Sequence, residues 1–329
     1  MTNYDVVTIG ETMLRLTPPN FLRLGQTKSL DVEVGGSESN TAVGLARLGA
    51  KVAWLSRLPC NPLGKVVTQT LTGYGVDTSH VQWSNSDRLG LYFYEEGVAP
   101  RGSRVIYDRA ASALSQMTPA HLPEDMFQPG RARLLHLTGI TPALSANVAQ
   151  MLQIAAALAK QAGWLLSFDV NYRGKLWSTA AARAGCAPFV ATADILFMPL
   201  RDAVAIYGVV GDAETAVSQL HHTFPHATIV LTLGKEGAIG CEASSGQIMR
   251  QPAFPAAGEI GRLGGGDAFT AGFLYGYLYA NDDPLANALR WGTATAAIKY
   301  TIPGDMPLIE KSEVEALLTS NGSGHSLSR

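Results

Sequence analysis

The chain has 329 residues, of which 47% are hydrophobic and 16% charged, and its 25 basic and 27 acidic side chains give a net charge of −2. A chain of this length can bury a large core, so we expect one large α/β domain or one domain with an appendage. The balanced charge argues against nucleic acid as a partner, and no apolar run is long enough to span a membrane. Its first residues lack the features of a signal peptide and its three cysteines lie far apart, so we expect a cytoplasmic protein with reduced thiols.

Strands and helices alternate along most of the chain. The expected strands are 6–9, 52–55, 134–137, 164–168, 195–198 and 228–233, and the expected helices are 39–48, 63–71, 146–162, 268–280 and 284–300. This alternation is typical of parallel strands joined by crossover helices, so we expect an α/β fold with a doubly wound, mostly parallel sheet. Ligands bind such sheets beyond the carboxyl ends of the strands.

Two segments, about 12–34 and 88–110, interrupt this pattern. Apolar and polar residues alternate in both, which is typical of antiparallel strands joined by turns. We expect one small antiparallel sheet that projects over the ligand edge as a lid and excludes water. Its exposed edges predict a homo-oligomer that forms through the lid. The domain is expected to cover residues 1–318 and to be followed by a flexible Ser/Gly-rich tail, 319–329.

The segment Gly-Gly-Gly-Asp-Ala-Phe-Thr-Ala-Gly at 264–272 is the most informative motif. Gly264, Gly265 and Gly266 allow the backbone to approach a ligand closely, and the N–H groups that open a helix attract anions. The run therefore predicts a phosphate cradle, with Asp267 placed to take a proton from an attacking hydroxyl. A plain Gly-rich turn with Asp267 as helix cap is the alternative interpretation.

A second glycine motif precedes the first long helix. Gly35 and Gly36 again permit close backbone approach, and Asn40 can both donate and accept hydrogen bonds. The alternative is a lid hinge followed by a capped helix.

Together the two motifs resemble the paired signatures of the ribokinase-like (PfkB) carbohydrate kinases. The first spans 35–40, with Gly49 and Gly64 downstream, and the second spans 264–269, where the family usually has Gly-Ala-Gly-Asp. The resemblance covers nearly the whole chain. It implies the sheet-plus-lid fold and ATP- and Mg²⁺-dependent phosphorylation of a sugar hydroxyl. By position it implies Asp267 as the catalytic base and the backbone at 264–266 as the anion hole.

Arginines and tyrosines near the expected ligand edge favour an acidic substrate. Arg173 follows a strand and offers a planar fork that can hold a carboxylate through two hydrogen bonds. Tyr107 and Arg109 share one face of a lid strand, and Tyr92 on the neighbouring lid segment adds a hydroxyl. In the alternative interpretation Arg173 pairs with Asp169 and the two tyrosines only pack the lid.

The chain resembles the 2-keto-3-deoxygluconate kinases in particular. This resemblance rests on segments 10–18, 35–40, 107–109 and 171–177. It implies that the residues that bind a sugar acid are Tyr92, Tyr107, Arg109 and Arg173, and that Asp305 of the late Gly-Asp pair lies near the substrate. The runner-up is a kinase of another, neutral sugar. A sugar-acid or nucleotide sensor without catalysis is the third hypothesis.

The segment 232–237 leaves a buried strand and turns, and it resembles the family's Thr-Leu-Gly-x-x-Gly segment that contacts ATP. The residues concerned are Thr232, Gly234, Lys235 and Gly237. Lys235 could reach a phosphate, although most lysines are solvated. Thr293, on the last long helix, falls near the position where the family contacts adenine.

Several positions depart from the family pattern. Gly261 stands where the family has an Asp that helps to hold a monovalent cation, so activation by K⁺ is weakly supported, and Arg262 could instead touch the nucleotide phosphates. The family's Asn-x-x-Glu motif, tied to Mg²⁺, begins here with Pro199, and only Asp202 keeps an acid as an indirect metal contact. Cys60 stands where an acidic residue is expected.

Overall fold

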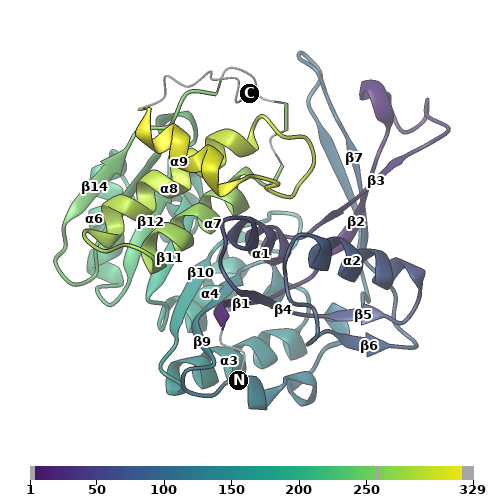
Figure 1. Cartoon of the computed structure of the whole chain (residues 1–329), viewed down its shortest axis with the longest axis horizontal. Coiled ribbons are helices and arrows are strands. Elements are labelled where there is room, and N and C mark those ends of the chain that lie inside the picture. The colour runs from purple at the N-terminus through teal and green to yellow at the C-terminus, as the bar shows by residue number, and fades with distance from the viewer. Residues whose placement is uncertain (1–3, 257–259, 262, 321–329) are drawn as a thin grey trace.

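A computed structural model describes residues 4–256, 260–261 and 263–320 (Figure 1). Its centre is an eight-stranded sheet with the order β14-β13-β12-β11-β10-β9-β1-β4. The strands from β12 to β4 are parallel, and β13 and β14 extend the sheet antiparallel beyond β12. The strands are β1 (Tyr4–Ile9), β4 (Val52–Leu55), β9 (Ala132–Thr138), β10 (Leu165–Asp169), β11 (Ile195–Pro199), β12 (Thr228–Thr232), β13 (Ala238–Cys241) and β14 (Ile248–Gln251). The doubly wound, mostly parallel sheet predicted from the sequence is confirmed.

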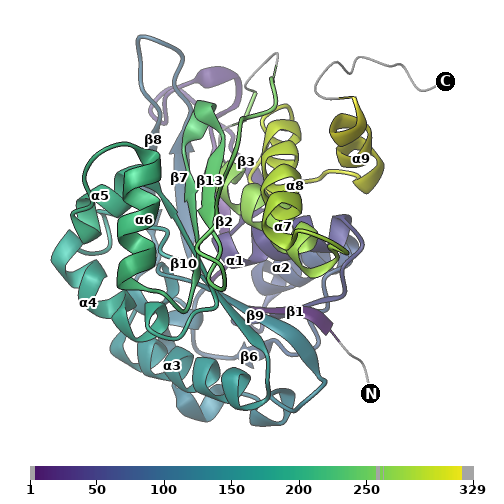
Figure 2. The same ribbon diagram turned by 90° about the vertical axis from the view of Figure 1, so that its left-hand side faces the viewer.

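Helices cover both faces of this sheet (Figure 2). One face carries α3 (Ala146–Gln161), α4 (Thr179–Val190), α5 (Leu200–Tyr207) and α6 (Ala213–Thr223). The other carries α1 (Ser37–Arg47), α2 (Pro62–Gly73), α7 (Gly265–Leu278) and α8 (Pro284–Lys299), and α9 (Lys311–Thr319) packs on α8. Side-chain caps begin several of these helices; in α3, for example, the Ser145 hydroxyl accepts from the Val148 N–H. Each central strand is covered on both faces, which explains its continuous apolar sequence.

Aromatic packing fixes α7 on the sheet. Phe273 of α7 meets Phe197 of β11 edge to face, with ring centroids 5.0 Å apart, and Phe269 lies 6.5 Å from the same ring. Phe197 and Phe273 are fully buried. The helix that begins at the glycine run is therefore anchored to the middle of the sheet.

The lid is a four-stranded sheet with the order β3-β2-β7-β8, which projects from one side of the body (Figure 1). Its strands are β2 (Met13–Thr17), β3 (Asp31–Gly35), β7 (Leu91–Glu95) and β8 (Arg104–Asp108). The two hairpins are antiparallel as predicted, but the central pair β2·β7 is parallel. The reason is that β2 and β7 both run outward from the body, whereas β3 and β8 return.

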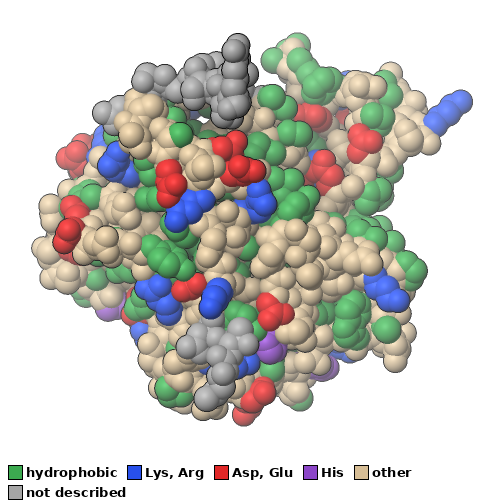
Figure 3. All heavy atoms as spheres, viewed as in Figure 1, with side chains coloured by type: hydrophobic (Ala, Val, Ile, Leu, Met, Phe, Trp, Pro, Cys, Tyr) green, Lys and Arg blue, Asp and Glu red, His purple; other side chains and the backbone are tan. Residues whose placement is uncertain are grey.

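Some elements were not expected from the sequence. A short parallel pair, β5 (Arg57–Pro59) and β6 (Gln82–Ser84), lies beside α2. The tail predicted for 319–329 lies largely outside the described residues. Within the described part of the chain, no helix is both long and apolar enough to cross a bilayer. Acidic and basic side chains are interspersed over the face seen in Figure 3.

Candidate active site

The glycine run forms the first turn of α7 and is pressed against the loop that follows α8. Gly264 has a φ of 74°, and a Cβ there would lie 1.8 Å from the carbonyl oxygen of Asp305. A Cβ on Gly265 would lie 2.7 Å from the Tyr300 ring, whereas Gly266 faces open space. Only glycine fits the first two positions, and the backbone at 266 remains open to a ligand.

Asp267 is held by residues from the other end of the chain. Its two carboxylate oxygens accept hydrogen bonds from Ser37 Oγ and Asn40 Nδ2, both at 2.7 Å. The Ser37 hydroxyl in turn accepts from Asn171 Nδ2 at 2.7 Å. The two glycine motifs thus meet at one carboxylate, although Ser37 and Asp267 are 230 residues apart.

Electrostatics keep Asp267 more basic than a free aspartate. Burial raises the pKa of Asp267, and the hydrogen bonds from Ser37 and Asn40 and the charges of Arg173 and Lys299 offset part of this rise. The observed pairing does not match a simple helix cap, because the N-cap of α7 is Gly264 and the Asp267 side chain accepts from two residues of α1.

Two further carboxyl groups near Asp267 have raised pKa values. Burial raises the pKa of Glu38 to about 7, and its Oε1 accepts from the hydroxyls of Thr138 at 2.8 Å and Thr141 at 2.5 Å. Burial also raises the pKa of Asp169 to about 7, with a further contribution from the Asp267 charge. Burial thus favours the neutral form of both groups, which would limit the negative charge around Asp267.

Arg173 provides positive charge to this region. It is partly buried, and its Nη1 donates to the carbonyl of Tyr172 at 3.2 Å. Its charge lowers the pKa values of Asp267 and Asp169, although burial outweighs it at both. The ion pairs of the described residues do not include one between Arg173 and Asp169.

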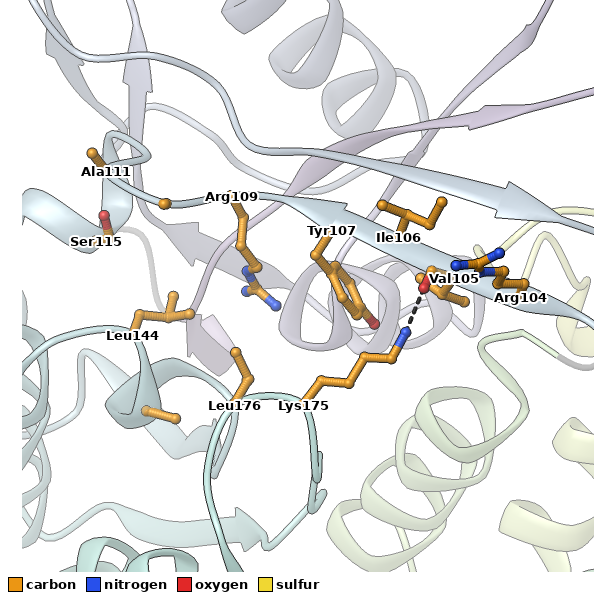
Figure 4. A pocket seen from close by; sticks show the side chains of 12 residues that line it. Arg104, Val105, Ile106, Tyr107, Arg109, Ala111, Ser115, Leu144, Lys175 and Leu176 are labelled. Carbon is orange, nitrogen blue, oxygen red and sulfur yellow. Dashed lines mark hydrogen bonds between the residues drawn. The ribbon is translucent and has the colours of Figure 1, made fainter. Parts of the chain in front are cut away.

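A cavity of about 660 Å³, here called the lid cavity, lies beneath β8 (Figure 4). Tyr107 and Arg109 point from β8 toward the segment that carries Lys175 and Leu176. Arg109 is already ion-paired with the buried Glu11, and its guanidinium carbon lies 5.5 Å from the centre of the Tyr107 ring. Both predicted lid residues therefore line one cavity, but Glu11 neutralises the charge of Arg109.

Tyr92, Gly35 and Asp305, which are also predicted to bind the substrate, lie close together where the lid meets the body. Tyr92 and Tyr107 face each other across β7 and β8, with ring centroids 5.9 Å apart. A Cβ on Gly35 would lie 2.7 Å from the Tyr92 hydroxyl and 3.0 Å from Asp305 Cγ. Asp305 is buried, bonds to Tyr92 and forms an ion pair with Arg15 Nη1 at 2.9 Å.

Gly36 completes this group from the start of α1. A Cβ there would lie 2.1 Å from the Glu11 carbonyl oxygen, and the Gly36 N–H donates to Asn40 Oδ1 at 3.4 Å. Gly36 thus joins β3 of the lid to α1, which has no side-chain cap at this end, and a hinge at this point stays a prediction.

A second cavity of about 810 Å³, here called the body cavity, opens beside the first turn of α7. Its walls include Gly265 and Gly266, and also four of the five residues predicted to bind nucleotide: Thr232, Gly234, Gly237 and Thr293. The fifth, Lys235, does not line it. The Thr293 hydroxyl donates to the Leu289 carbonyl of its own helix at 2.9 Å, so it is engaged within α8.

Asp202 is buried in the first turn of α5. Its Oδ1 pairs with Arg201 Nε at 3.3 Å, and its Oδ2 has no hydrogen-bond partner. Pro199 and Arg201 line the body cavity but Asp202 does not. Among the residues that the structure describes, no three His, Cys, Asp or Glu side chains are grouped so that they could hold a metal ion. Arg262 lies outside the described residues.

Comparison with known proteins identifies the family. Residues 3–311 match the model of the pfkB family of carbohydrate kinases. The chain belongs to this family and is a sugar kinase.

Two relatives and one solved structure bear on the substrate class. A 2-dehydro-3-deoxygalactonokinase of Haloferax volcanii is 39% identical over 97% of this chain and 98% of its own length. A 2-dehydro-3-deoxygluconokinase of Bacillus subtilis is 30% identical over 92% of this chain and 91% of its own. The crystal structure of 2-dehydro-3-deoxygluconokinase from Thermotoga maritima superposes with a TM-score of 0.86 at 31% identity, and the match covers 96% of this chain and 98% of that one.

The fold extends to more distant kinases. A putative ribokinase II of Escherichia coli, solved in complex with ATP and Mg²⁺, has a TM-score of 0.85 at 18% identity, covering 96% of this chain and 99% of that one. This likeness supports the shared fold alone.

Sequence reasoning missed several residues of the site. Ser37 and Glu38 lie inside the first glycine motif. The available signal for Ser37 was its spacing of three residues to Asn40, which puts both on one helix face. Glu38 bonds to Thr138 and Thr141 and had no such signal. Asn171 begins the segment 171–177 that carries the family resemblance, but no pattern in the sequence assigns it a role. Lys299 had no signal, because a lysine in the last turn of a helix is usually solvated.

Proposed function

We propose that this chain transfers the γ-phosphoryl group of ATP to a hydroxyl of a 2-keto-3-deoxy sugar acid, with Asp267 as the general base. The observation that carries the proposal is the Asp267 carboxylate. Ser37 and Asn40 hold it at the start of a helix whose Gly265 and Gly266 line the body cavity. The names of the relatives support the substrate class.

In this account the body cavity takes the nucleotide. Thr232, Gly234 and Gly237 leave β12 at the carboxyl edge of the sheet, where ligands of such sheets bind. The first N–H groups of α7 are oriented toward a terminal phosphate, and the helix dipole adds positive potential there. Mg²⁺, held mainly by the nucleotide phosphates, would neutralise part of their charge.

The sugar acid enters under the lid. Arg173 pairs with its carboxylate, and Tyr92 and Tyr107 contact its hydroxyl groups. Gly35 lets Tyr92 and Asp305 pack against the backbone at the entrance to α1, because a Cβ there would lie 2.7 Å from the Tyr92 hydroxyl. Asp267 takes the proton of the attacking hydroxyl, while the amides at 264–266 stabilise the charge of the phosphoryl group in flight.

One observation favours a second candidate, a neutral sugar. Arg109 is neutralised by Glu11, and so Arg173 is left as the main cation available to a substrate carboxylate among the residues proposed to bind it. If Arg173 serves only to balance Asp267 and Asp169, the four residues proposed to bind the substrate have little preference for an anion.

A coupled assay of ADP formation across a substrate panel separates these candidates. The panel contains 2-keto-3-deoxygluconate, 2-keto-3-deoxygalactonate, ribose and fructose. We expect turnover of at least one of the two acids, with kcat/KM about tenfold or more above that for either neutral sugar, as for a charge-assisted pair. Turnover of neutral sugars alone would support the second candidate. Nucleotide binding without turnover of any sugar would support a sensor.

A further inference from the structure

Lys299 is a fully buried lysine in the last turn of α8, with 0% of its surface exposed. Its ammonium donates to the carbonyl oxygens of Ile302 and Gly304, both at 2.9 Å. Burial lowers its pKa, and the charges of Asp305, Glu33 and Asp267 oppose this shift. A buried cation is costly unless it is paired and hydrogen-bonded. The surrounding backbone therefore has to supply hydrogen-bond acceptors for the ammonium.

The ammonium lies beside the position where the chain departs from its family. A Cβ on Gly261 would lie 2.8 Å from the Ile302 carbonyl oxygen and 3.6 Å from Lys299 Nζ. The Gly261 N–H also faces the Tyr300 carbonyl at 3.3 Å, which keeps residue 261 against the loop after α8. A carboxylate at 261 would point to the place that the Lys299 ammonium takes.

The loop that Lys299 holds is part of the active site. It runs from Tyr300 to Asp305, and both ends contact the glycine run: the Tyr300 ring lies against Gly265, and the Asp305 carbonyl against Gly264. The Lys299 charge also lowers the pKa of Asp267, against the larger effect of burial. A cation at this point thus braces the anion-binding turn and adds positive potential below it.

The Lys299 ammonium leaves no room for a bound monovalent cation at this point. Carbonyl oxygens are the ligands that K⁺ takes in proteins, but two of these carbonyls are already occupied by an ammonium, and Gly261 supplies no carboxylate. A second cation would be repelled by the first. We propose that the ammonium of Lys299 acts as a built-in replacement for a monovalent cation, which makes this kinase independent of K⁺. The inference rests on the proposed function for its catalytic consequence.

The first test uses the unaltered protein. Activity and melting temperature are measured in chlorides of K⁺, Na⁺ and tetramethylammonium at one ionic strength. We expect kcat to differ by less than about threefold between the salts, and the melting temperature to be the same in K⁺ and Na⁺. A strong K⁺ requirement in the unaltered protein would overturn the proposal.

The second test removes the ammonium. Lys299→Ala opens space at the two carbonyls, and we expect kcat to fall about tenfold or more in tetramethylammonium, the loss expected for charge-assisted hydrogen bonds. K⁺ or NH₄⁺ should restore much of that loss and raise the melting temperature of this variant. Lys299→Met fills the space without a charge, so it should lose activity that neither K⁺ nor NH₄⁺ restores. Lys160→Ala, which removes a surface ion pair with Asp194, is the control and should respond to no cation.

Each outcome decides the matter. Recovery of Lys299→Ala only when K⁺ or NH₄⁺ is present supports the proposal. If Lys299→Ala folds and its melting temperature and kcat do not depend on the cation, then Lys299 only packs in the core, and the proposal is overturned. The melting measurements need no substrate, so they stand even if the sugar acid assigned above is wrong.

Discussion

The role proposed for Asp267 rests on how its carboxylate is held rather than on its place in a glycine-rich sequence. Ser37 and Asn40 each donate to one oxygen, which fixes the carboxylate while leaving it ionisable. Burial raises its pKa, so it is a better proton acceptor than a free aspartate, and its hydrogen-bond donors and the nearby cations oppose part of that rise.

The acidic limb of the pH–rate profile should report the raised pKa of Asp267. A general base must be deprotonated, so kcat should fall as the pH falls through the pKa of Asp267, which lies above the usual value for aspartate. Asn40→Ala removes a hydrogen bond that lowers this pKa, and we expect the limb to move to higher pH. Asn61→Ala, which removes only the cap of α2, is the control and should leave the limb in place. An unmoved limb in Asn40→Ala would contradict the assignment.

Arg173 decides the substrate class in this account. Arg173→Ala should raise KM for a sugar acid far more than for a neutral sugar of similar size, because a charge-assisted pair to a carboxylate contributes about 1.5–3 kcal/mol. The comparison needs both substrates on the same variant, with Arg183→Ala as a control at a position beside Tyr207. Equal changes for the two substrates would favour the neutral-sugar candidate.

At the scale of elements, the site depends on the contact between the first turn of α7 and the loop after α8. Phe273 and Phe269 fix α7 on β11, and the missing side chain of Gly264 lets the loop carrying Asp305 approach. The two parts thus set the position of Asp267 together.

Gly264→Ala should disturb this contact. Alanine would need a φ of 74° and would collide with the Asp305 carbonyl, so we expect a loss of about 1–3 kcal/mol in the free energy of unfolding. Gly266→Ala is the matched control for stability, because a Cβ there meets open space. Denaturant unfolding measures both. Equal stability of the two variants would show that the loop carrying Asp305 can move away from residue 264 at little cost in free energy.

The sequence predicted elements far better than the contacts between them. The strand–helix alternation and both glycine motifs were readable because each lies within a short stretch. The bond from Ser37 to Asp267 joins residues 230 apart, and the ion pair of Arg109 with Glu11 depends on how the lid folds back, so neither has a local signal. The parallel pairing of β2 with β7 was missed for the same reason.

Reasoning from residue type also failed where packing overrode it. Lys299 occupies a position typical of a solvated lysine but is buried, and Lys235, expected near phosphates, does not line the body cavity. The roles assigned to Tyr92, Tyr107 and Asp305 remain predictions, although the structure brings these side chains together.

At the scale of the whole molecule, the lid presents two open edges, β3 and β8. Val32 on β3 is 57% exposed and Ile106 on β8 is 39% exposed. Bare edges and exposed apolar side chains recruit partners, so we propose that two copies associate through the lid.

Sedimentation at micromolar concentration should therefore show at least a dimer. Val32→Asp should shift the distribution toward monomer, whereas Val210→Asp, at a site on the body that is 68% exposed, should not. A monomer in the unaltered protein, or no difference between the two variants, would count against association through the lid.

Identification of the product tests the central claim most directly. A 2-keto-3-deoxy sugar acid is incubated with ATP and either the unaltered protein or Asp267→Asn, and the phosphorylated acid is quantified by mass spectrometry. The account predicts a phosphorylated acid from the unaltered protein and formation about 10²-fold or more slower with Asp267→Asn, since general-base catalysis is lost. Formation at a near-normal rate by Asp267→Asn, or ADP release by the unaltered protein without a phosphorylated acid, would contradict it.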